Sequence, residues 1–360
     1  MSKDYYIIPI FVPHFGCPHD CVFCNQRRIT GLSTDVTQDY VKKTIEEHLA
    51  TFPKRDIVVE VAFYGGSFTG IPKEIQRELL SIPLEFKNQG RIKAIRLSTR
   101  PDYIDDDILN LLKEYDVDTI ELGVQSLCDD VLYESGRGHN SKQVYMASKL
   151  IKEHGFNLGL QMMIGLVGDS REKSIFTGKE FIKLRPYCVR IYPTLIIKDT
   201  YLEKLYHQEK YKPLTLEEAI DISTDLIMLF EYNDINVIRV GLQPTENINF
   251  GKDVIAGPFH PSFRQLVESN KYKILLKDYL DKLKLDYDGK DLTIYVHQKN
   301  ISNLVGQKSS NMKYFKDRYN FKNIRVYKKD LPKDIVELNI SNTTLKLDMK
   351  YLTGQYVKGI

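Results

Sequence analysis

Three cysteines within eight residues constrain this chain more than any other stretch of its sequence. Cys17, Cys21 and Cys24 are separated by gaps of three and two residues. They follow a strand-like apolar run at residues 6–12 and precede a polar loop at 25–31. A short loop can bring three thiolates to one side of a metal centre, and thiolates favour zinc, copper or iron–sulfur clusters. The stretch therefore predicts a metal-binding loop at the end of a strand.

The kind of metal depends on whether a fourth ligand is at hand. A structural zinc site needs four ligands at comparable spacing, and neither Cys128 nor Cys188 supplies one. His14 and His19 keep a zinc site open as the alternative. Three cysteines without a fourth suit a four-iron–four-sulfur (4Fe–4S) cluster that leaves one iron free to bind a small molecule. We therefore expect a 4Fe–4S cluster.

The overall composition is that of an ordinary soluble protein. The chain has 360 residues, which is long enough for one large α/β domain and a small second domain. Its net charge of +3 is too small to indicate nucleic acid, so any basic surface has to be local. Five cysteines, three of them in one loop, indicate a reducing compartment rather than a disulfide framework. The N-terminal apolar run is too short for a signal peptide or a membrane span, so we expect a cytoplasmic protein with no membrane partner.

Strand-like and helix-like segments alternate along the first 240 residues. Strands are expected at 6–12, 57–64, 94–98, 119–123, 158–164, 188–192 and 236–240, and helices between them at 36–50, 73–81, 105–115, 142–154, 171–184 and 216–232. Each parallel crossover needs a helix to return the chain, so the alternation predicts a parallel sheet. Six or seven such units favour a partial TIM-like (β/α) barrel over an open doubly wound sheet. We place this α/β domain at residues 1–260.

Glycine and polar residues collect at the carboxyl ends of the expected strands, where barrel enzymes bind their substrates. Adjacent glycines let backbone groups approach a ligand closely. Glutamine amides can bond ribose hydroxyls, and an arginine can hold a carboxylate through two hydrogen bonds. The candidate ligand-binding residues at these strand ends are Tyr64, Gly65, Gly66, Ser67, Ser98, Arg100, Gln125, Arg137, Gln161 and Gly165.

The cysteine pattern, with the aromatic Phe23 before its last cysteine, resembles the signature of the radical S-adenosylmethionine (SAM) superfamily. The resemblance implies a 4Fe–4S cluster on Cys17, Cys21 and Cys24, with SAM bound at the open iron through its amino and carboxylate groups. It implies that Phe23 and the strand-end residues hold SAM, which is cleaved to a deoxyadenosyl radical. It also implies an external one-electron donor of the flavodoxin or ferredoxin type.

Further blocks narrow the family. Residues 123–126 and 136–139 look like those of oxygen-independent coproporphyrinogen oxidase and its relatives. A closer similarity lies in residues 98–103 and 189–197, which resemble the radical SAM domain of the Elongator catalytic subunit. This second resemblance extends over about 11–246 and implies a radical SAM enzyme that modifies an RNA base, with tRNA favoured.

The chain also departs from the Elongator subunit. The gap between its first two cysteines is narrower, and Ser98 stands where relatives often carry glutamate. Too few residues follow Glu246 for the acetyltransferase domain of that subunit. We therefore do not expect chemistry that depends on acetyl-CoA.

Residues 261–360 predict a small C-terminal α/β domain with a leading helix at 263–283. A strand, a short helix, the Gly306-Gln307-Lys308-Ser309 loop, a second helix and a second strand follow in that order. The order resembles the core of a KH domain, whose Gly-x-x-Gly loop clamps a nucleic-acid backbone, although Ser309 replaces the second glycine. The resemblance implies RNA binding by Gly306, Gln307, Lys308 and Ser309. An ordinary domain with a lysine-rich face is the alternative.

Three functions stay open on this evidence. The favoured one is a radical SAM enzyme acting on RNA, and the second is a radical SAM enzyme acting on a small molecule. The third is a non-catalytic metal-bearing protein that binds RNA. Tyr64, Tyr192 and Gln243 are expected to face the barrel interior, but no residue is assigned as catalytic. Zinc in place of iron would exclude the enzymes, and co-purifying RNA would separate the first two functions.

Overall fold

The structure is a computed structural model that describes residues 5–12, 21–25, 36–53, 57–244, 248–283, 285–341 and 343–360. By its internal contacts the chain divides into two units. The first comprises Met1–Leu214 and Leu242–Phe259, and the second comprises Thr215–Gly241 and His260–Ile360. A boundary near residue 260 was expected from the sequence, whereas the grouping of Thr215–Gly241 with the C-terminal residues was not. Among the described residues, no helix is both long enough and apolar enough to cross a membrane.

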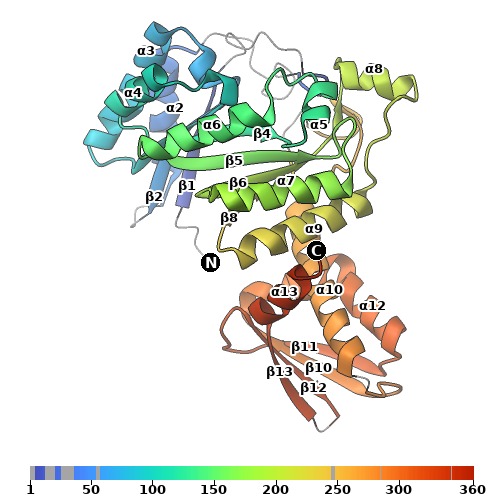
Figure 1. Ribbon diagram of the computed structural model, residues 1–360. Coiled ribbons are helices and arrows are strands. Elements are labelled where there is room, and N and C mark those ends of the chain that lie inside the picture. Colours follow the sequence, from blue (N-terminus) through green and yellow to red (C-terminus); the bar gives the residue numbers. More distant parts are fainter. Residues whose placement is uncertain are drawn as a thin grey trace. The chain divides into compact units, whose positions relative to one another are not determined.

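The first unit is built on parallel strands that are neighbours in sequence order (Figure 1). The strands are β1 (Tyr5–Val12), β2 (Val58–Gly65), β3 (Ala94–Thr99), β4 (Thr119–Gln125), β5 (Asn157–Ile164) and β6 (Cys188–Pro193). The helices that return the chain are α2 (Gln38–Thr51), α3 (Lys73–Asn88), α4 (Asp106–Glu114), α6 (Ser141–Glu153) and α7 (Arg171–Leu184), with the short α5 (Asp129–Glu134) before α6. This arrangement confirms the predicted partial barrel of the radical SAM type.

Polar side chains set the start of several of these helices. Thr37, Asp105 and Ser170 each accept a hydrogen bond from a backbone N–H in the first turn of α2, α4 and α7. Asn140 and Gln143 form a reciprocal capping box at the start of α6. A cap of this kind contributes about 1 kcal/mol, so the loops before these four helices end at defined residues.

The strands of the first unit present two faces of different character, because successive side chains point to opposite sides. One face is apolar and fully buried, and it carries Ile8, Ile10, Val61, Phe63, Leu97, Ile120, Leu122, Leu160, Met162 and Ile191. The other face, here called the interior face, is largely polar. The pairing register brings together on it Glu60, Tyr64, Arg96, Ser98, Glu121, Gly123, Gln161 and Arg190.

The second unit contains α9 (Leu216–Tyr232), β8 (Asn236–Val240), the long helix α10 (Phe263–Leu283) and a four-stranded sheet. The strand order in that sheet is β11 (Asn323–Lys328), β10 (Asp291–Val296), β12 (Ile335–Ile340) and β13 (Thr343–Asp348). β10 is parallel to β11 and antiparallel to β12. The expected order of strand, helix, loop, helix and strand is present, with α11 (Ile301–Val305) and α12 (Ser310–Tyr319) as the two helices. β12, β13 and the final helix α13 (Met349–Val357) were not predicted from the sequence.

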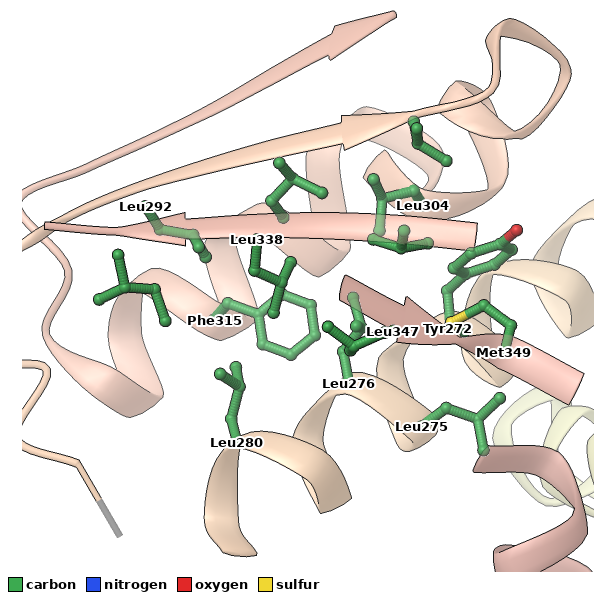
Figure 2. Close-up of a cluster of buried hydrophobic side chains, with 14 of the residues drawn as sticks. Tyr272, Leu275, Leu276, Leu280, Leu292, Leu304, Phe315, Leu338, Leu347 and Met349 are labelled. Atoms are coloured by element: carbon green, nitrogen blue, oxygen red, sulfur yellow. The ribbon is translucent and has the colours of Figure 1, made fainter. Parts of the chain in front are cut away.

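One face of this four-stranded sheet forms the core of the second unit. Leu292, Leu338 and Leu347 of the sheet pack against Leu276 and Leu280 of α10 and Phe315 of α12 (Figure 2). All are at most 2% exposed. The opposite face of the sheet carries no part of this core.

Candidate cofactor site

The described part of the cysteine loop presents two of the three predicted cluster ligands. Cys21 is buried and Cys24 is half-buried. The backbone N–H of Cys24 donates to the carbonyl of Cys21 at 2.9 Å, so a single turn carries both residues. Cys17 lies outside the described residues, as do His14 and His19.

Two backbone hydrogen bonds hold this turn in place. The N–H of Val22 donates to the carbonyl of Ser135 at 3.1 Å, and the carbonyl of Val22 accepts from the N–H of Leu202 at 2.7 Å. Leu202 lies in α8 (Tyr201–His207), which follows the short strand β7 (Ile196–Ile197). Phe23, predicted to contact SAM, packs against an apolar cluster that contains Val22, Ile196, Leu202 and Tyr211. Phe23 therefore anchors the turn on its apolar side.

Arg137 connects this turn to the end of β4. Its Nη1 atom lies 3.3 Å from Cys21 Sγ, and its Nη2 atom donates to the carbonyl of Gly123 at 2.5 Å. The Nε atom of the same guanidinium is buried and has no hydrogen-bond partner among the described residues. Metals are ligated by the thiolate form of cysteine, and the Arg137 guanidinium would balance the negative charge of a metal-bound Cys21 sulfur. The donor set therefore fits a thiolate-bound iron–sulfur cluster.

Arg100 was predicted to hold a ligand carboxylate, but its guanidinium is engaged within the protein. Nε and Nη2 each lie 2.9 Å from a carboxylate oxygen of Asp102, and Nη2 also donates to the carbonyl of Arg137. Burial raises the pKa of Asp102, but the bonded Arg100 guanidinium outweighs it and holds that pKa below its ordinary value. Arg100 is only 3% exposed, so its contacts position the backbone of Arg137.

Two glutamines predicted to contact SAM meet at the carboxyl ends of β4 and β5. The side-chain amide of Gln161 donates to Gln125 Oε1 at 3.3 Å. Gln125 has a φ of 71°, and the β4–β5 register shifts between Gly123 and Gln125. A Cβ atom on Gly123 would lie 3.3 Å from the Gln125 amide and 3.4 Å from Arg137 Nη2. Because Gly123 has no side chain, the amide pair and Arg137 have space to come together there.

The remaining predicted residues lie at other strand ends. Gly65 has a φ of 104°, and the N–H of Gly66 donates to the carbonyl of Val12, so the double glycine closes against the end of β1. Ser67 is buried before a short 3-10 turn, and Ser98 is half-buried on the interior face. Gly165 has a φ of 73°, and a Cβ atom there would lie 2.7 Å from Leu214. Gly165 thus allows the tight turn after β5 to form.

A buried network of charges on the interior face was missed by the sequence analysis. Arg96 Nε lies 2.6 Å from Glu60, and Arg96 Nη1 lies 2.9 Å from Glu121 Oε1. Arg190 Nη2 lies 3.0 Å from the same Glu121 oxygen. Burial raises the pKa of Glu121, but the two guanidiniums outweigh this effect and hold it below its ordinary value. The missed signal was a charged residue at an interior-face position in each of four otherwise apolar strands.

Tyr64 extends this network toward the strand ends. Arg190 Nη2 donates to the Tyr64 hydroxyl at 2.5 Å, and the Arg190 guanidinium lies 5.0 Å from the centre of the tyrosine ring. Burial and the Glu121 carboxylate raise the pKa of Tyr64 well above its ordinary value, so the phenol stays protonated. The network also depends on Gly159, because a Cβ atom there would lie 2.7 Å from the Glu121 side chain.

His139 lies beside this site in a neutral form. Burial, followed by the positive charges of Arg137 and Arg100, lowers the pKa of His139 to about 3. Its Nε2 atom lies 3.2 Å from the carbonyl of Val124 and therefore carries the proton. Its Nδ1 atom is buried without a partner among the described residues.

Comparison with known proteins agrees with this arrangement. Residues 11–175 match the radical SAM superfamily domain, and residues 186–273 match the radical SAM C-terminal domain. The chain is 31% identical over 259 residues to a tRNA uridine(34) acetyltransferase of Methanocaldococcus jannaschii, covering 60% of this chain and 47% of that protein. It is 29% identical over 191 residues to Elongator complex protein 3 of Schizosaccharomyces pombe, covering 48% of this chain and 35% of that protein.

A solved structure extends the comparison to the fold. The Elp3 protein of Methanocaldococcus infernus superimposes with a TM-score of 0.61 and 21% identity, covering 78% of this chain and 64% of that chain. The chain spans about half the length of the tRNA uridine(34) acetyltransferases that it matches. Members of the matched superfamily bind a 4Fe–4S cluster and SAM, for which the cysteine turn and Arg137 are suited. The chain is a radical SAM enzyme by its domains: it belongs to the radical SAM superfamily, with a radical SAM domain followed by the radical SAM C-terminal domain.

Proposed function

We propose that this protein modifies a base of RNA by radical SAM chemistry, with tRNA as the favoured substrate. The observation that carries the proposal is the 31% identity over 259 residues with a relative named for its action on uridine 34 of tRNA. Because that alignment covers only 47% of the relative, the proposal takes from it the class of substrate and leaves out acetyl transfer. The position in the RNA and the group added are not part of the proposal.

Different residues of the first unit would hold the cluster and SAM. Cys17, Cys21 and Cys24 would ligate the cluster as thiolates. When bound, the cluster and SAM supply a deoxyadenosyl radical that can remove a hydrogen atom from a substrate C–H bond. An electron donor of the flavodoxin or ferredoxin type would supply the reducing electron. We assign the Gln125–Gln161 amide pair to the ribose hydroxyls of SAM, because the two amides meet at the carboxyl ends of β4 and β5, close to Arg137.

The charge network would close the interior at the amino-terminal ends of the strands. Arg96, Glu60 and Glu121 are at most 6% exposed, and they fill the space between β2, β3 and β4 with paired charges. Tyr64 and Ser98 lie nearer the carboxyl ends and are only half-buried. A substrate base would therefore enter from the carboxyl ends. The interior, closed at the amino-terminal ends of the strands, would keep water away from the radical.

The C-terminal unit offers a loop suited to the phosphates of RNA. Gly306, Lys308 and Ser309 have φ values of 77°, 52° and 60°, all in the left-handed region. The N–H groups of Gly306 and Ser309 donate to the carbonyls of Ser302 and Gly306, so the loop would meet a phosphate through Gln307 and the Lys308 side chain. A Cβ atom on Gly306 would lie 2.4 Å from Ser310 Oγ, so the loop requires glycine at that position. We retain Gly306, Gln307, Lys308 and Ser309 as the proposed contact to the RNA backbone.

The test is a reaction on RNA that lacks the modification. Total tRNA from a strain without this gene is incubated with reconstituted protein, SAM and a reductant, and its nucleosides are then examined by mass spectrometry. We expect a nucleoside of altered mass with the wild type and none with Cys24→Ala. The small-molecule alternative would be favoured if the protein cleaves SAM but neither binds RNA nor produces an altered nucleoside. Protein that takes up zinc but no iron would indicate the non-catalytic alternative.

A further inference from the structure

The four-stranded sheet of the second unit has one open face whose side chains differ sharply from its buried face. Alternate residues of each strand point away from the apolar core, and the pairing register aligns them in two rows across the sheet. One row contains Tyr327, Tyr295, Glu337 and Lys346. The other contains Arg325, Thr293, Asn339 and Thr344. The two rows thus combine aromatic, basic and polar side chains, and the one aliphatic residue that the strands place on this face, Ile335, lies outside both rows.

Two tyrosines form an aromatic platform on the first two strands. The rings of Tyr295 and Tyr327 are stacked, with centroids 5.9 Å apart and planes inclined by 29°. Tyr327 lies on the edge strand β11 and remains 49% exposed. Lys329 Nζ lies 5.4 Å from the ring centre of Tyr295. Because Tyr295 is covered by Lys329, the accessible aromatic surface is that of Tyr327.

The charges within these two rows favour an anionic partner, whereas Asp291 and Asp348 lie on the same face at strand ends outside the rows. The one acidic member of the rows, Glu337, is neutralised by Lys329 at 2.5 Å. Arg325 and Lys346 are exposed, and neither forms an ion pair with a described acidic residue. They stand on the two outer strands of the sheet, on either side of the central strands. Strands in a sheet lie about 4.8 Å apart, so two cations three strands apart span roughly 14 Å, the length of a few nucleotides.

From this combination we infer that the open face binds single-stranded RNA, with a base stacked on Tyr327 and the flanking phosphates near Arg325 and Lys346. Stacking on aromatic rings is how single-stranded nucleic acid is held without reading its sequence. A self-associating sheet face would instead need aliphatic side chains, which both rows lack. The inference rests on the proposed RNA substrate, and it assigns a surface separate from the Gly306–Ser309 loop.

A fluorescence experiment can test the stacking directly, because the chain contains no tryptophan. Tyr327→Trp places a single reporter on the open face, and Tyr351→Trp places one on α13, where Tyr351 is 64% exposed. The probes are an oligouridylate of twelve nucleotides and an abasic oligomer of the same length. We expect the oligouridylate to quench Tyr327→Trp but not Tyr351→Trp. The abasic oligomer should quench neither, because it offers phosphates without bases.

Binding measurements complete the test. Tyr327→Ala should weaken oligouridylate binding about tenfold, while Tyr327→Phe should retain it, because stacking needs the ring and not the hydroxyl. Lys346→Ala should weaken binding and lower its dependence on salt, whereas Lys358→Ala, which removes an equal charge at the end of α13, should not. SAM cleavage in the absence of RNA should be unchanged in every variant.

Three results would overturn the inference. RNA that binds the Tyr327→Trp protein without quenching it would place the RNA elsewhere and leave the proposed function standing. A wild-type dimer that Tyr327→Ala dissociates would assign the face to self-association. A wild type with no affinity for RNA of any kind would remove both this inference and the proposed RNA substrate.

Discussion

Arg137 and Cys21 lie 116 positions apart in the sequence, yet Arg137 Nη1 is 3.3 Å from Cys21 Sγ. The contact joins the cysteine turn after β1 to the loop between α5 and α6. It places a positive charge and a hydrogen-bond donor against a predicted cluster ligand. Hydrogen bonds to cluster sulfurs are one of the means by which a protein sets the reduction potential.

The first prediction follows from this contact. Arg137→Gln should lower the reduction potential of the reconstituted cluster, because a donor to the thiolate stabilises the reduced, more negative state. A hydrogen bond worth about 1.4 kcal/mol corresponds to about 59 mV for one electron. The measurement is a redox titration followed by electron paramagnetic resonance, with iron content as the control. A potential unchanged at full iron content would show that Arg137 does not act on the cluster.

The second prediction concerns the ligands. Alanine at Cys17, Cys21 and Cys24 together should abolish the charge-transfer absorbance of anaerobically reconstituted protein, which otherwise binds about four irons. Cys128→Ala and Cys188→Ala are the matched controls and should keep the absorbance. Cys188 lies at the start of β6, where burial raises its pKa to about 12, so it is a poor thiolate ligand. Full absorbance in the triple variant would refute the cluster assignment.

The third prediction concerns the buried charge network. Glu121→Gln removes the carboxylate that Arg96 and Arg190 share, and it should destabilise the protein by about 3–5 kcal/mol in denaturant unfolding. Glu153→Gln is the matched control, because it breaks an exposed helix pair with Lys149 and should change stability by less than about 0.5 kcal/mol. Equal stability of the two variants would mean that the network contributes no more than a surface pair.

The fourth prediction concerns His139 and pH. Its pKa falls from 6.5 to about 3 in the folded protein, so the unfolded chain binds the proton more readily within that range. The stability linked to His139 should be complete above about pH 6.5 and decline as the pH falls toward 3, by up to about 1.4 kcal/mol per pH unit. His139→Gln should lose less stability than the wild type between pH 7 and 5. Parallel losses in the two proteins, measured by urea unfolding, would contradict the assignment.

The fifth prediction concerns the Gly306–Ser309 loop. Changing both Gln307 and Lys308 to aspartate should weaken tRNA binding by repulsion of the phosphates, at equal salt concentration. Aspartate tolerates the left-handed backbone that Lys308 adopts, so the loop should keep its shape. SAM cleavage without RNA should be unaffected. Affinity equal to that of the wild type in a filter-binding assay would exclude the loop as a contact.

Much of the fold followed from local patterns. Strand-like segments alternating with helix-like segments predicted the parallel sheet, because a parallel connection needs a helix to return the chain. The cysteine spacing predicted a metal loop, because residues within one turn are neighbours whatever the rest of the chain does. The helix–loop–helix around Gly306 was also predictable, since a left-handed residue between two helices favours glycine.

Other features of the site depended on pairs that are distant in the sequence. Arg100 and Arg137 were both expected to face a ligand, but the fold sets Arg100 against Asp102 and sets Arg137 against Cys21. The alternation within a strand tells only which of its own side chains share a face. It did not show that Glu121 would lie between Arg96 and Arg190, because that depends on the register of β3, β4 and β6.

The sequence alone thus determined the kinds of element, the cysteine turn and the residues able to ligate metal, all of which are local. The tertiary structure alone decided which charges neutralise one another and which face of the C-terminal sheet stays open. Tyr295 and Tyr327 stack only because β10 and β11 pair in parallel at one register. A shift of one residue would send one ring into the core, and the free energy that prevents it comes from the whole packed apolar face.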